Sequence, residues 1–474
     1  MNLGTLLGCL GISCENPSQE ITSVTRDRKN VKEGSLFVAV KGKNSDGNDY
    51  IDEAFSAGAK AVVTDSERKG SGIINVSDAC RAYSFLSSAF FGNPQDKLKI
   101  IGITGTNGKT TTAQYLAHIL GKAGKKCAVI GTLGSFFGDY HSKTGYTTPP
   151  AEILFRELSC FVSLGAEYVI LEVSSQALVQ CRVDPIVFHV GVFTNIGRDH
   201  LDYHLNMEEY LKAKLRLRAL CRKTVVNADS LFAKAFDWQE DKNSLTFSVN
   251  DSYADICAKN VRYCGDYISF LILNSSSLIR VKVRGMSEMT LYNSLAAASA
   301  AIACGINAEI LPSALETLPE VKGRMEKLSD GDKDVYIDFA HTPEALYSVL
   351  SALKKVCVNK LWCVFGCGGE RDRGKRSEMG KIASSVADYV VITSDNPRGE
   401  SAQSIADDII KGIYNNNNIY TQLDRYRAIE YALRESVSGD IVLIAGKGHE
   451  EYQITAGEKK YFSDEIAVKN ILGV

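Results

Sequence analysis

Residues 99–124, KIIGITGTNGKTTTAQYLAHILGKAG, restrict the possible folds of this chain more than any other stretch. The apolar start predicts a strand. Leu116, Ile119, Leu120 and Ala123 then recur at i, i+3, i+4 and i+7, which places them on one face of a helix. Between strand and helix lies GTNGKTT (105–111), where glycine lets the backbone wrap closely enough for amide groups to point at a phosphate. The helix N-terminus adds a partial positive charge, so the segment predicts a phosphate-binding loop.

Two side chains of this loop have expected roles. Lys109 would reach the β- and γ-phosphates of a nucleotide, and Thr110 would bind Mg²⁺. The strict pattern of such loops places glycine at position 103, where this chain has Ile103; the glycines are Gly102, Gly105 and Gly108. The sequence therefore predicts a variant phosphate loop. The flanking strand and helix disfavour the alternative of a plain glycine-rich turn with an exposed lysine.

The rest of the chain alternates apolar strands with helical stretches, which favours parallel, helix-covered sheets. Residues 250–290 have the pattern of antiparallel strands instead. Gly-Asn-Pro at 92–94 and the segment PEVKGRMEKL at 319–328 interrupt the alternation. At about 100–200 residues per domain, 474 residues correspond to roughly three domains. We expect them to span 1–96, 97–322 and 323–474.

Composition excludes several classes of protein. The formal net charge of −2 gives no general attraction to nucleic acid or to a membrane surface. No run reaches the roughly 18 apolar residues of a membrane-spanning helix, and LAAASAAIACGI (295–306) is typical of a buried helix. Thirteen cysteines without a paired framework fit a reducing compartment. We expect a cytoplasmic monomer.

Two segments suggest metal ligands. Glu172 ends an apolar strand, and GRDHLDYH contains Asp199, His200, Asp202 and His204. Mg²⁺ prefers oxygen ligands and nucleotide phosphates, which suits a strand-end glutamate beside Thr110. His200 and His204 are four residues apart, so a zinc pair is conceivable, but a third zinc ligand is missing. An ordinary solvated, charged loop is the remaining interpretation.

In the third predicted domain, four strands end in polar or glycine-rich clusters, and open α/β sheets bind ligands beyond such ends. One of these ends, TSDNPRG (393–399), contains Asp395, Asn396, Pro397 and Arg398. Pro397 fixes its own φ and favours an extended Asn396, so Arg398 would project from a stiff corner. A planar guanidinium suits a carboxylate ligand. The alternative is a surface arginine on an ordinary turn.

Taken together, the chain resembles the Mur ligase family. The segments that carry the resemblance run in the family's order and span nearly the whole chain: GITGTNGKTT, TTP, LEVSSQALVQCRV, TNIGRDHLDYH, YLKAK, GRME, DFAHTP, FGCGGERDRGKR, SDNPR and AGKGHEEYQ. The resemblance implies a mixed α/β N-terminal domain that binds a UDP-sugar, a P-loop ATPase domain with a parallel sheet, and a Rossmann-like C-terminal domain that binds an amino acid. It implies an ATP-dependent amide ligase of peptidoglycan precursor synthesis, which adds meso-diaminopimelate to UDP-N-acetylmuramoyl-L-alanyl-D-glutamate through an acyl phosphate.

The resemblance also assigns roles to positions of this chain. ATP would contact Gly105, Thr106, Asn107, Gly108, Lys109, Thr110, Thr111, Asn293, Arg324 and Asp338. The UDP-sugar peptide would contact Lys43, Asn44, Ser45, Tyr146, Thr147, Thr148, Ser174, Gln180 and Arg182. Mg²⁺ would be held by Thr110, Glu172, His200 and Lys214, the last as a carbamate formed with CO₂. The amino acid would contact Arg371, Asp395, Asn396, Pro397, Arg398, Gly446 and Glu450. The implied catalytic residues are Lys109, Glu172, His200 and Lys214.

The chain departs from the family pattern at two places. Asp27-Arg28-Lys29 replaces the Asp-Ser-Arg of the first domain, and Gln176 replaces a histidine. Two other functions remain possible at this stage: a folylpolyglutamate synthetase, which shares the phosphate loop but lacks the first domain, and a non-catalytic nucleotide-binding regulator. His341 is either the base that deprotonates the attacking amine or a core or hinge histidine.

Overall fold

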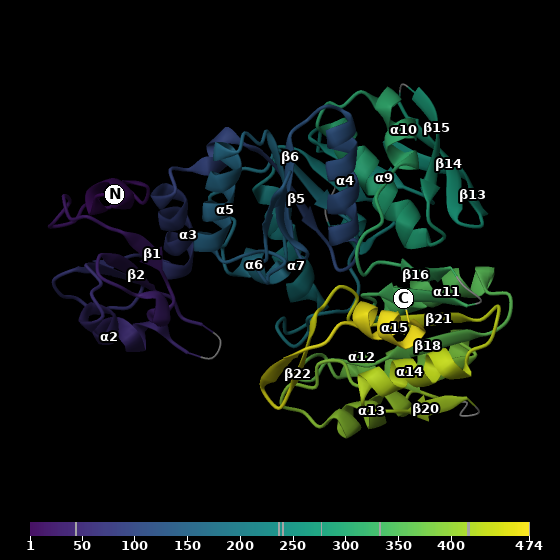
Figure 1. The fold of residues 1–474 in the computed structure, drawn as a ribbon. Coiled ribbons are helices and arrows are strands. Elements are labelled where there is room, and N and C mark those ends of the chain that lie inside the picture. The colour runs from purple at the N-terminus through teal and green to yellow at the C-terminus, as the bar shows by residue number, and fades with distance from the viewer. Residues whose placement is uncertain are drawn as a thin grey trace.

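The computed structural model describes residues 1–42, 45–235, 238, 241–275, 277–330, 333–414 and 418–473. Figure 1 shows three α/β bodies in chain order, with the N-terminal body at one end of the middle body and the C-terminal body beneath the middle one. The predicted three-domain α/β fold is confirmed. Among the described residues, none of the helices combines the length and the apolar character that crossing a membrane requires.

The N-terminal domain contains a four-stranded parallel sheet, in the order β1 (Ser23–Thr25), β2 (Ser35–Ala39), β3 (Ala61–Thr64) and β4 (Ile73–Asn75). Its helices are α1 (Leu3–Gly8), α2 (Ile51–Ser56) and α3 (Ala79–Phe90). The side chain of Asn2 caps α1 by accepting a hydrogen bond from the Thr5 amide at 2.8 Å. Helix α3 packs on α5 (Ala151–Ser163), which connects this domain to the middle one.

The middle domain is built on one eleven-stranded sheet, ordered β15-β14-β13-β12-β11-β10-β5-β9-β6-β7-β8. Its strands are β5 (Lys99–Thr104), β6 (Cys127–Gly131), β7 (Gly134–Phe137), β8 (Tyr140–Ser142), β9 (Tyr168–Glu172), β10 (Val190–Phe193), β11 (Thr224–Asn227), β12 (Ser244–Ser248), β13 (Ile256–Cys264), β14 (Tyr267–Asn274) and β15 (Ser277–Arg284). The central strands of this order, β13, β12, β11, β10, β5, β9 and β6, run parallel. Antiparallel strands extend the sheet at its two edges, β14 and β15 at one and β7 and β8 at the other. The antiparallel pattern predicted for 250–290 is therefore correct, and it extends the parallel sheet.

Helices cover this sheet on both sides. They are α4 (Lys109–Lys122), α5, α6 (Ser175–Val179), α7 (Met207–Ala219), α8 (Leu231–Ala235), α9 (Glu288–Ala303) and α10 (Leu311–Glu316). The predicted helical face of α4 is confirmed for Leu116, Ile119 and Leu120, which are fully buried, whereas Ala123 is the C-cap residue just beyond the helix and is only partly buried. The alanine-rich α9 packs on α4, and this places Asn293 beside the phosphate loop.

The C-terminal domain has a six-stranded sheet, in the order β16 (Glu326–Asp330), β17 (Asp334–Asp338), β21 (Ile441–Ala445), β18 (Leu361–Phe365), β19 (Tyr389–Ile392) and β20 (Ile419–Thr421). All but β16 run parallel. Helices α11 (Pro343–Val356), α12 (Gly374–Val386) and α13 (Ala402–Ile410) cover one face, and α14 (Arg425–Glu435) and α15 (Asp464–Leu472) cover the other. A hairpin of β22 (Tyr452–Thr455) and β23 (Glu458–Tyr461) lies beside the carboxyl ends of the parallel strands.

Candidate active site

The phosphate loop connects β5 to α4 in a conformation that requires glycine. Gly105 and Gly108 have φ of +152° and +85°, and a Cβ on Gly108 would lie 2.3 Å from Asn293 Oδ1. The amides of Thr106 and Asn107 donate to the carbonyl and side-chain oxygens of Asn195, both at 2.9 Å. The first amides of α4 have no partner within the helix, so they remain to receive an anion.

Lys109 lies over this loop and donates from Nζ to the carbonyl oxygens of Gly105 at 2.8 Å and Thr106 at 3.0 Å. Burial lowers the pKa of Lys109, although Glu172 and Asp199 partly oppose that shift. Among the described residues, this partly buried ammonium hydrogen-bonds carbonyl oxygens alone, so it is poised to interact with a more strongly charged acceptor.

Glu172 fits a cation site. It ends β9, is 1% exposed, and accepts hydrogen bonds from the Thr132 amide, the Thr132 hydroxyl and the Thr110 hydroxyl at 2.9, 3.0 and 2.9 Å. No ion pair with lysine or arginine compensates its charge among the residues that the structure describes. A buried, oriented carboxylate beside a phosphate loop has the chemistry that Mg²⁺ uses.

His200 lines the same cavity as the phosphate loop and has a left-handed backbone conformation, with φ of +55°. Burial lowers its pKa to about 4, so the imidazole is neutral near pH 7, as a metal ligand must be. Gln176, which replaces the family histidine, contacts His200 Nδ1 at 3.3 Å. His204 instead contacts the Ser175 hydroxyl at 2.9 Å, and the described residues include no cluster of three or more His, Cys, Asp or Glu side chains able to hold a metal. The geometry does not support a zinc pair.

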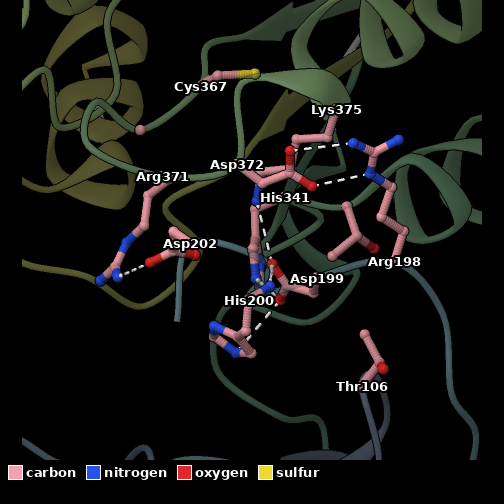
Figure 2. A network of polar contacts seen from close by, with 12 residues as sticks. Thr106, Arg198, Asp199, His200, Asp202, His341, Cys367, Arg371, Asp372 and Lys375 are labelled. Carbon is pink, nitrogen blue, oxygen red and sulfur yellow. Dashed lines mark hydrogen bonds and ion pairs between the residues drawn. The ribbon is translucent and has the colours of Figure 1, made fainter. Parts of the chain in front are cut away.

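Asp199 joins the middle and C-terminal domains (Figure 2). Its carboxylate lies 3.4 Å from Lys375 Nζ, from His341 Nε2 and from His200 Nε2. Burial alone would raise the pKa of Asp199, but Lys375, His341 and His200 outweigh burial and hold the pKa well below its usual range. Two more ion pairs cross the same boundary, Arg198–Asp372 at 2.9 Å and Arg371–Asp202 at 3.0 Å.

His341 is poorly placed to act as a base. Its Nδ1 lies 2.7 Å from the Phe339 carbonyl oxygen, which can only accept, so Nδ1 carries a proton. Its Nε2 faces the Asp199 carboxylate, which also only accepts. Both ring nitrogens thus face acceptors of the protein, and the geometry favours the interdomain role of this histidine.

Lys214 lies on α7 and is only 1% exposed. Its Nζ donates to the Gly105 carbonyl at 2.8 Å and lies 4.6 Å from the centre of the Tyr210 ring. Burial, together with the nearby charge of Lys109, holds the pKa of Lys214 well below its usual range. An exposed lysine would stay charged near pH 7, whereas burial favours the neutral amine of Lys214.

The predicted nucleotide residues meet in a second cavity of about 60 Å³, lined among others by Asn107, Gly108, Thr111, Asn293, Arg324 and Asp338. Arg324 donates to the Thr110 hydroxyl at 3.3 Å and stacks over Phe339 with its guanidinium carbon 4.5 Å from the ring centre. Asp338 accepts from the Met325 and Ala340 amides, both at 2.7 Å. A larger cleft of about 650 Å³ shares Asn293 with this cavity.

The predicted sugar-peptide residues of the middle domain form one connected group. Arg182 donates to the Thr148 carbonyl at 2.5 Å and to Gln180 Oε1 at 2.8 Å, and it lies 6.0 Å from the Tyr146 ring centre. The Thr148 hydroxyl lies 3.3 Å from the hydroxyl of Ser174. Burial and the nearby charge of Arg26 lower the pKa of Arg182 to about 10. Thr147 alone of this group lines the main cavity.

The first domain is predicted to contribute Lys43, Asn44 and Ser45 to that group. Ser45 is an exposed residue, and Lys43 and Asn44 lie outside the described residues. Asp27 caps a 3₁₀ turn by accepting from the Lys29 amide at 3.0 Å, and Arg28 pairs with Glu53 on the surface.

The phosphate loop and the SDNPR corner both line the main cavity, which has a volume of about 230 Å³. Arg398 has a left-handed φ of +54°, and its amide donates to the Ile454 carbonyl at 3.0 Å. Its guanidinium donates to the Gly369 carbonyl at 2.7 Å, and no carboxylate pairs with it among the residues that the structure describes. Burial and the like charge of Arg371 lower the pKa of Arg398, so an anion bound here would relieve their repulsion.

The same cavity gathers most of the predicted amino-acid residues: Arg371, Asp395, Asn396, Arg398, Gly446 and Glu450. The cavity is also lined by Lys109, Thr110, Glu172, His200 and Arg324. Gly105, Lys214 and Pro397 are buried and do not line this cavity. Sequence reasoning missed Thr132, Asn195, Lys375 and Lys447, which hold the loops in place. The segments TNIGRDH and AGKGHE already contained Asn195 and Lys447, but nothing local distinguished them from solvated polar residues.

Three protein-family models match the chain in order. The Mur ligase family catalytic domain matches residues 20–84, the Mur ligase middle domain matches 103–301, and the Mur ligase glutamate ligase domain matches 323–448. The UDP-N-acetylmuramoyl-L-alanyl-D-glutamate–2,6-diaminopimelate ligase of Caldanaerobacter subterraneus subsp. tengcongensis is 39% identical over 465 residues, which cover 96% of both chains. The chain belongs to the Mur ligase family. The enzyme of the same name from Bacillus cereus is 37% identical and covers 100% of this chain and 99% of its own.

A solved structure supports the same placement among Mur ligases. A UDP-N-acetylmuramoyl-L-alanyl-D-glutamate–2,6-diaminopimelate ligase structure superposes with a TM-score of 0.71 at 31% identity, covering 100% of this chain and 99% of the other. The resemblance inferred from the motifs is thereby confirmed for the family and for the three-domain fold.

Proposed function

We propose that this Mur ligase joins meso-diaminopimelate to UDP-N-acetylmuramoyl-L-alanyl-D-glutamate in the cytoplasm, with hydrolysis of ATP to ADP and phosphate. The observation that carries the proposal is one cavity of about 230 Å³ that is lined both by Lys109 and Thr110 and by Arg371 and Arg398. A phosphate-binding loop and two arginines therefore share one space; Arg371 pairs with Asp202, whereas no carboxylate pairs with Arg398 among the described residues. That arrangement suits transfer of a phosphoryl group to the carboxylate of one substrate while a second substrate is bound through its own carboxylate in the same cavity.

The chemistry follows from the need to activate a carboxylate. A carboxylate oxygen of the D-glutamyl residue attacks the γ-phosphorus of ATP, and the bond to ADP breaks. The neutral amine of diaminopimelate then attacks the acyl carbon, phosphate leaves, and a proton is lost from nitrogen. Phosphoryl transfer depends mainly on positioning and charge neutralisation, which Lys109 and the first amides of α4 supply. Closure of the two domains around the cavity would keep water from the acyl phosphate.

Mg²⁺ is the cation that the site residues would hold. Thr110, Glu172 and His200 supply a hydroxyl, a buried carboxylate and a neutral imidazole. Lys214, once carbamylated, would add a carboxylate-like group behind the phosphate loop. When bound, Mg²⁺ would neutralise charge on the phosphates.

We further infer that residues 1–96 bind the UDP-sugar, 97–322 bind ATP and 323–474 bind the amino acid. The group of Tyr146, Thr148, Gln180 and Arg182 lies near the N-terminal domain, since Arg26 is close enough to influence Arg182. A folylpolyglutamate synthetase would have no use for such a first domain, and the match of residues 20–84 to the Mur ligase family counts against that alternative. Intact Lys109, Glu172 and Lys214 count against a non-catalytic regulator.

The decisive assay measures phosphate release. We expect release from ATP only when the UDP-linked dipeptide and diaminopimelate are both present. Release that depends on a folate substrate would indicate the synthetase, and no turnover under any of these conditions would indicate a regulator.

Arg398→Asn is expected to reduce kcat/KM for diaminopimelate by about two to four orders of magnitude. Diaminopimelate has a distal carboxylate that lysine lacks, and removing one partner of a buried charge pair costs roughly 3–5 kcal/mol. Residual activity with lysine should change far less. The measurement is kcat/KM for both amino acids at saturating ATP and UDP-linked dipeptide.

Arg434→Asn is the matched control, because Arg434 is a surface arginine of the same domain paired with Glu430. It should leave both values unchanged. Equal proportional losses for diaminopimelate and lysine in Arg398→Asn would mean that Arg398 does not recognise the distal carboxylate.

A further inference from the structure

Lys447 is a fully buried lysine directly behind the proposed amino-acid site. It follows β21 in the loop AGKGHE, and its side chain has no exposed surface. Its Nζ donates to Glu450 Oε2 at 3.1 Å and to Asn396 Oδ1 at 3.2 Å, and it lies 3.9 Å from Asp395 Oδ1. All three partners line the main cavity, whereas Lys447 does not.

Lys447 determines which way the Asn396 amide points. Oδ1 of Asn396 accepts from Lys447 and from the Ile454 amide at 3.0 Å, so this end of the side chain is occupied by two donors. Nδ2 must then point the other way, and it donates to Glu450 Oε2 at 3.0 Å. Lys447 and Asn396 thus hold the same oxygen of Glu450, and the orientation of that carboxylate is fixed from behind.

Lys447 also balances charge. Asp395 and Glu450 are two carboxylates that both lie near Lys447, a buried cation; the buried Arg425, which pairs with Asp464, also acts on both of them at longer range. Without Lys447, like charges would face each other in a poorly solvated site, where repulsion is strong. Asp395 has little room to move away from Glu450, because its Oδ2 packs closely against Gly446. A Cβ at Gly446 would lie only 2.8 Å from that oxygen.

We propose that Lys447 is a positioning residue for the amino-acid substrate. It holds Glu450 and Asn396 in the orientation that receives the distal ammonium of diaminopimelate. This inference rests on the proposed function, because it takes the cavity beside Arg398 as the amino-acid site. Lys447 touches neither substrate nor reacting atoms, so its effect reaches the substrate only through Glu450, Asn396 and Asp395.

The test is Lys447→Met, which keeps the length of the side chain and removes its charge. We expect KM for diaminopimelate to rise about a hundredfold, as when one member of a buried charge pair is removed. KM for ATP and for the UDP-linked dipeptide should stay at wild-type values, and kcat at saturating diaminopimelate should change little. Lys333→Met is the matched control, since Lys333 also hydrogen-bonds buried backbone in this domain, to the Leu433 carbonyl at 2.6 Å, but away from the cavity.

A double-mutant cycle with Glu450→Gln separates positioning from a purely structural role. Lys447→Met/Glu450→Gln contains neither member of the pair, so it should fold even if Lys447→Met does not. If Lys447 acts in part through Glu450, Lys447→Met should raise KM for diaminopimelate by a smaller factor in the Glu450→Gln background than in the wild type. Equal factors in the two backgrounds, or equal rises in KM for all three substrates in Lys447→Met, would overturn the inference. A wild-type enzyme that releases no phosphate with diaminopimelate would instead refute the proposed function.

Discussion

Lys109→Ala is expected to lower the rate of ATP-dependent ligation by at least about a thousandfold, while the protein remains folded. The Lys109 ammonium is held over the phosphate loop by the carbonyl oxygens of Gly105 and Thr106. Phosphoryl transfer requires little covalent chemistry from a side chain. Loss of a positive charge beside the transferring group therefore lowers the rate of transfer directly. The measurement is the rate of ADP formation with all three substrates saturating.

Lys122→Ala is the matched control for this variant. Lys122 lies in the last turn of the same helix and is exposed, so its loss should leave the rate unchanged. Affinity for the UDP-linked dipeptide should also be unchanged in Lys109→Ala, because none of the proposed sugar-peptide residues that the structure describes hydrogen-bonds Lys109. Near-normal ligation by a folded Lys109→Ala enzyme would rule out the assignment of this loop as the ATP site.

The parts of the fold that sequence could predict are those encoded locally. The phosphate loop was recognisable because strand, glycine turn and helix follow one another within 26 residues, and its helical face is buried as expected. The strand ends at Glu172 and at Asp395 were visible as polar residues directly after apolar runs. Parallel strands of one sheet end at the same edge, so such residues converge within each domain without further information, but the meeting of the two sheets' ends at one cavity is a feature of the tertiary fold.

Contacts between distant segments were not predictable in the same way. The stiff corner was attributed to Pro397, but the structure adds a left-handed Arg398 that is hydrogen-bonded through its amide to β22, more than fifty residues away. No local pattern in the sequence predicts that this hairpin would hydrogen-bond the corner. Backbone strain of this kind persists only where the surroundings hold it, and those surroundings come from the tertiary fold.

Side-chain environments were equally hidden. The sequence allows His341 to be a candidate base, but its ring lies between the Phe339 carbonyl and the Asp199 carboxylate, which are both hydrogen-bond acceptors. Lys447 looked like any lysine in a polar loop, yet it is completely buried. A one-dimensional pattern reports residue type and spacing, whereas pKa and hydrogen-bond state depend on what surrounds each group.

Lys214→Ala is expected to be nearly inactive, and short carboxylates such as formate or acetate should partly restore its activity. The proposed group is a carbamate, formed when a neutral lysine amine attacks CO₂, makes an N–C bond and releases one proton. Burial holds the pKa of Lys214 well below its usual range, which keeps the amine neutral and nucleophilic. A carbamate also replaces a positive charge by a negative one, so the residue changes from repelling Mg²⁺ to attracting it. The measurements are ligation rate with and without added carboxylate.

Lys212→Ala provides the matched control two residues away. Lys212 lies on the same helix but is more than half exposed and pairs with Glu208 at 2.9 Å, so it has no cause to stay neutral. It should ligate at the wild-type rate. Wild type and Lys212→Ala equilibrated with ¹³C-bicarbonate should both show a carbamate carbon resonance by NMR, and Lys214→Ala should lack it. An active, Mg²⁺-loaded wild-type enzyme without that resonance would show that Lys214 works as the free amine, and its hydrogen bond to Gly105 would then be its whole contribution to the phosphate loop.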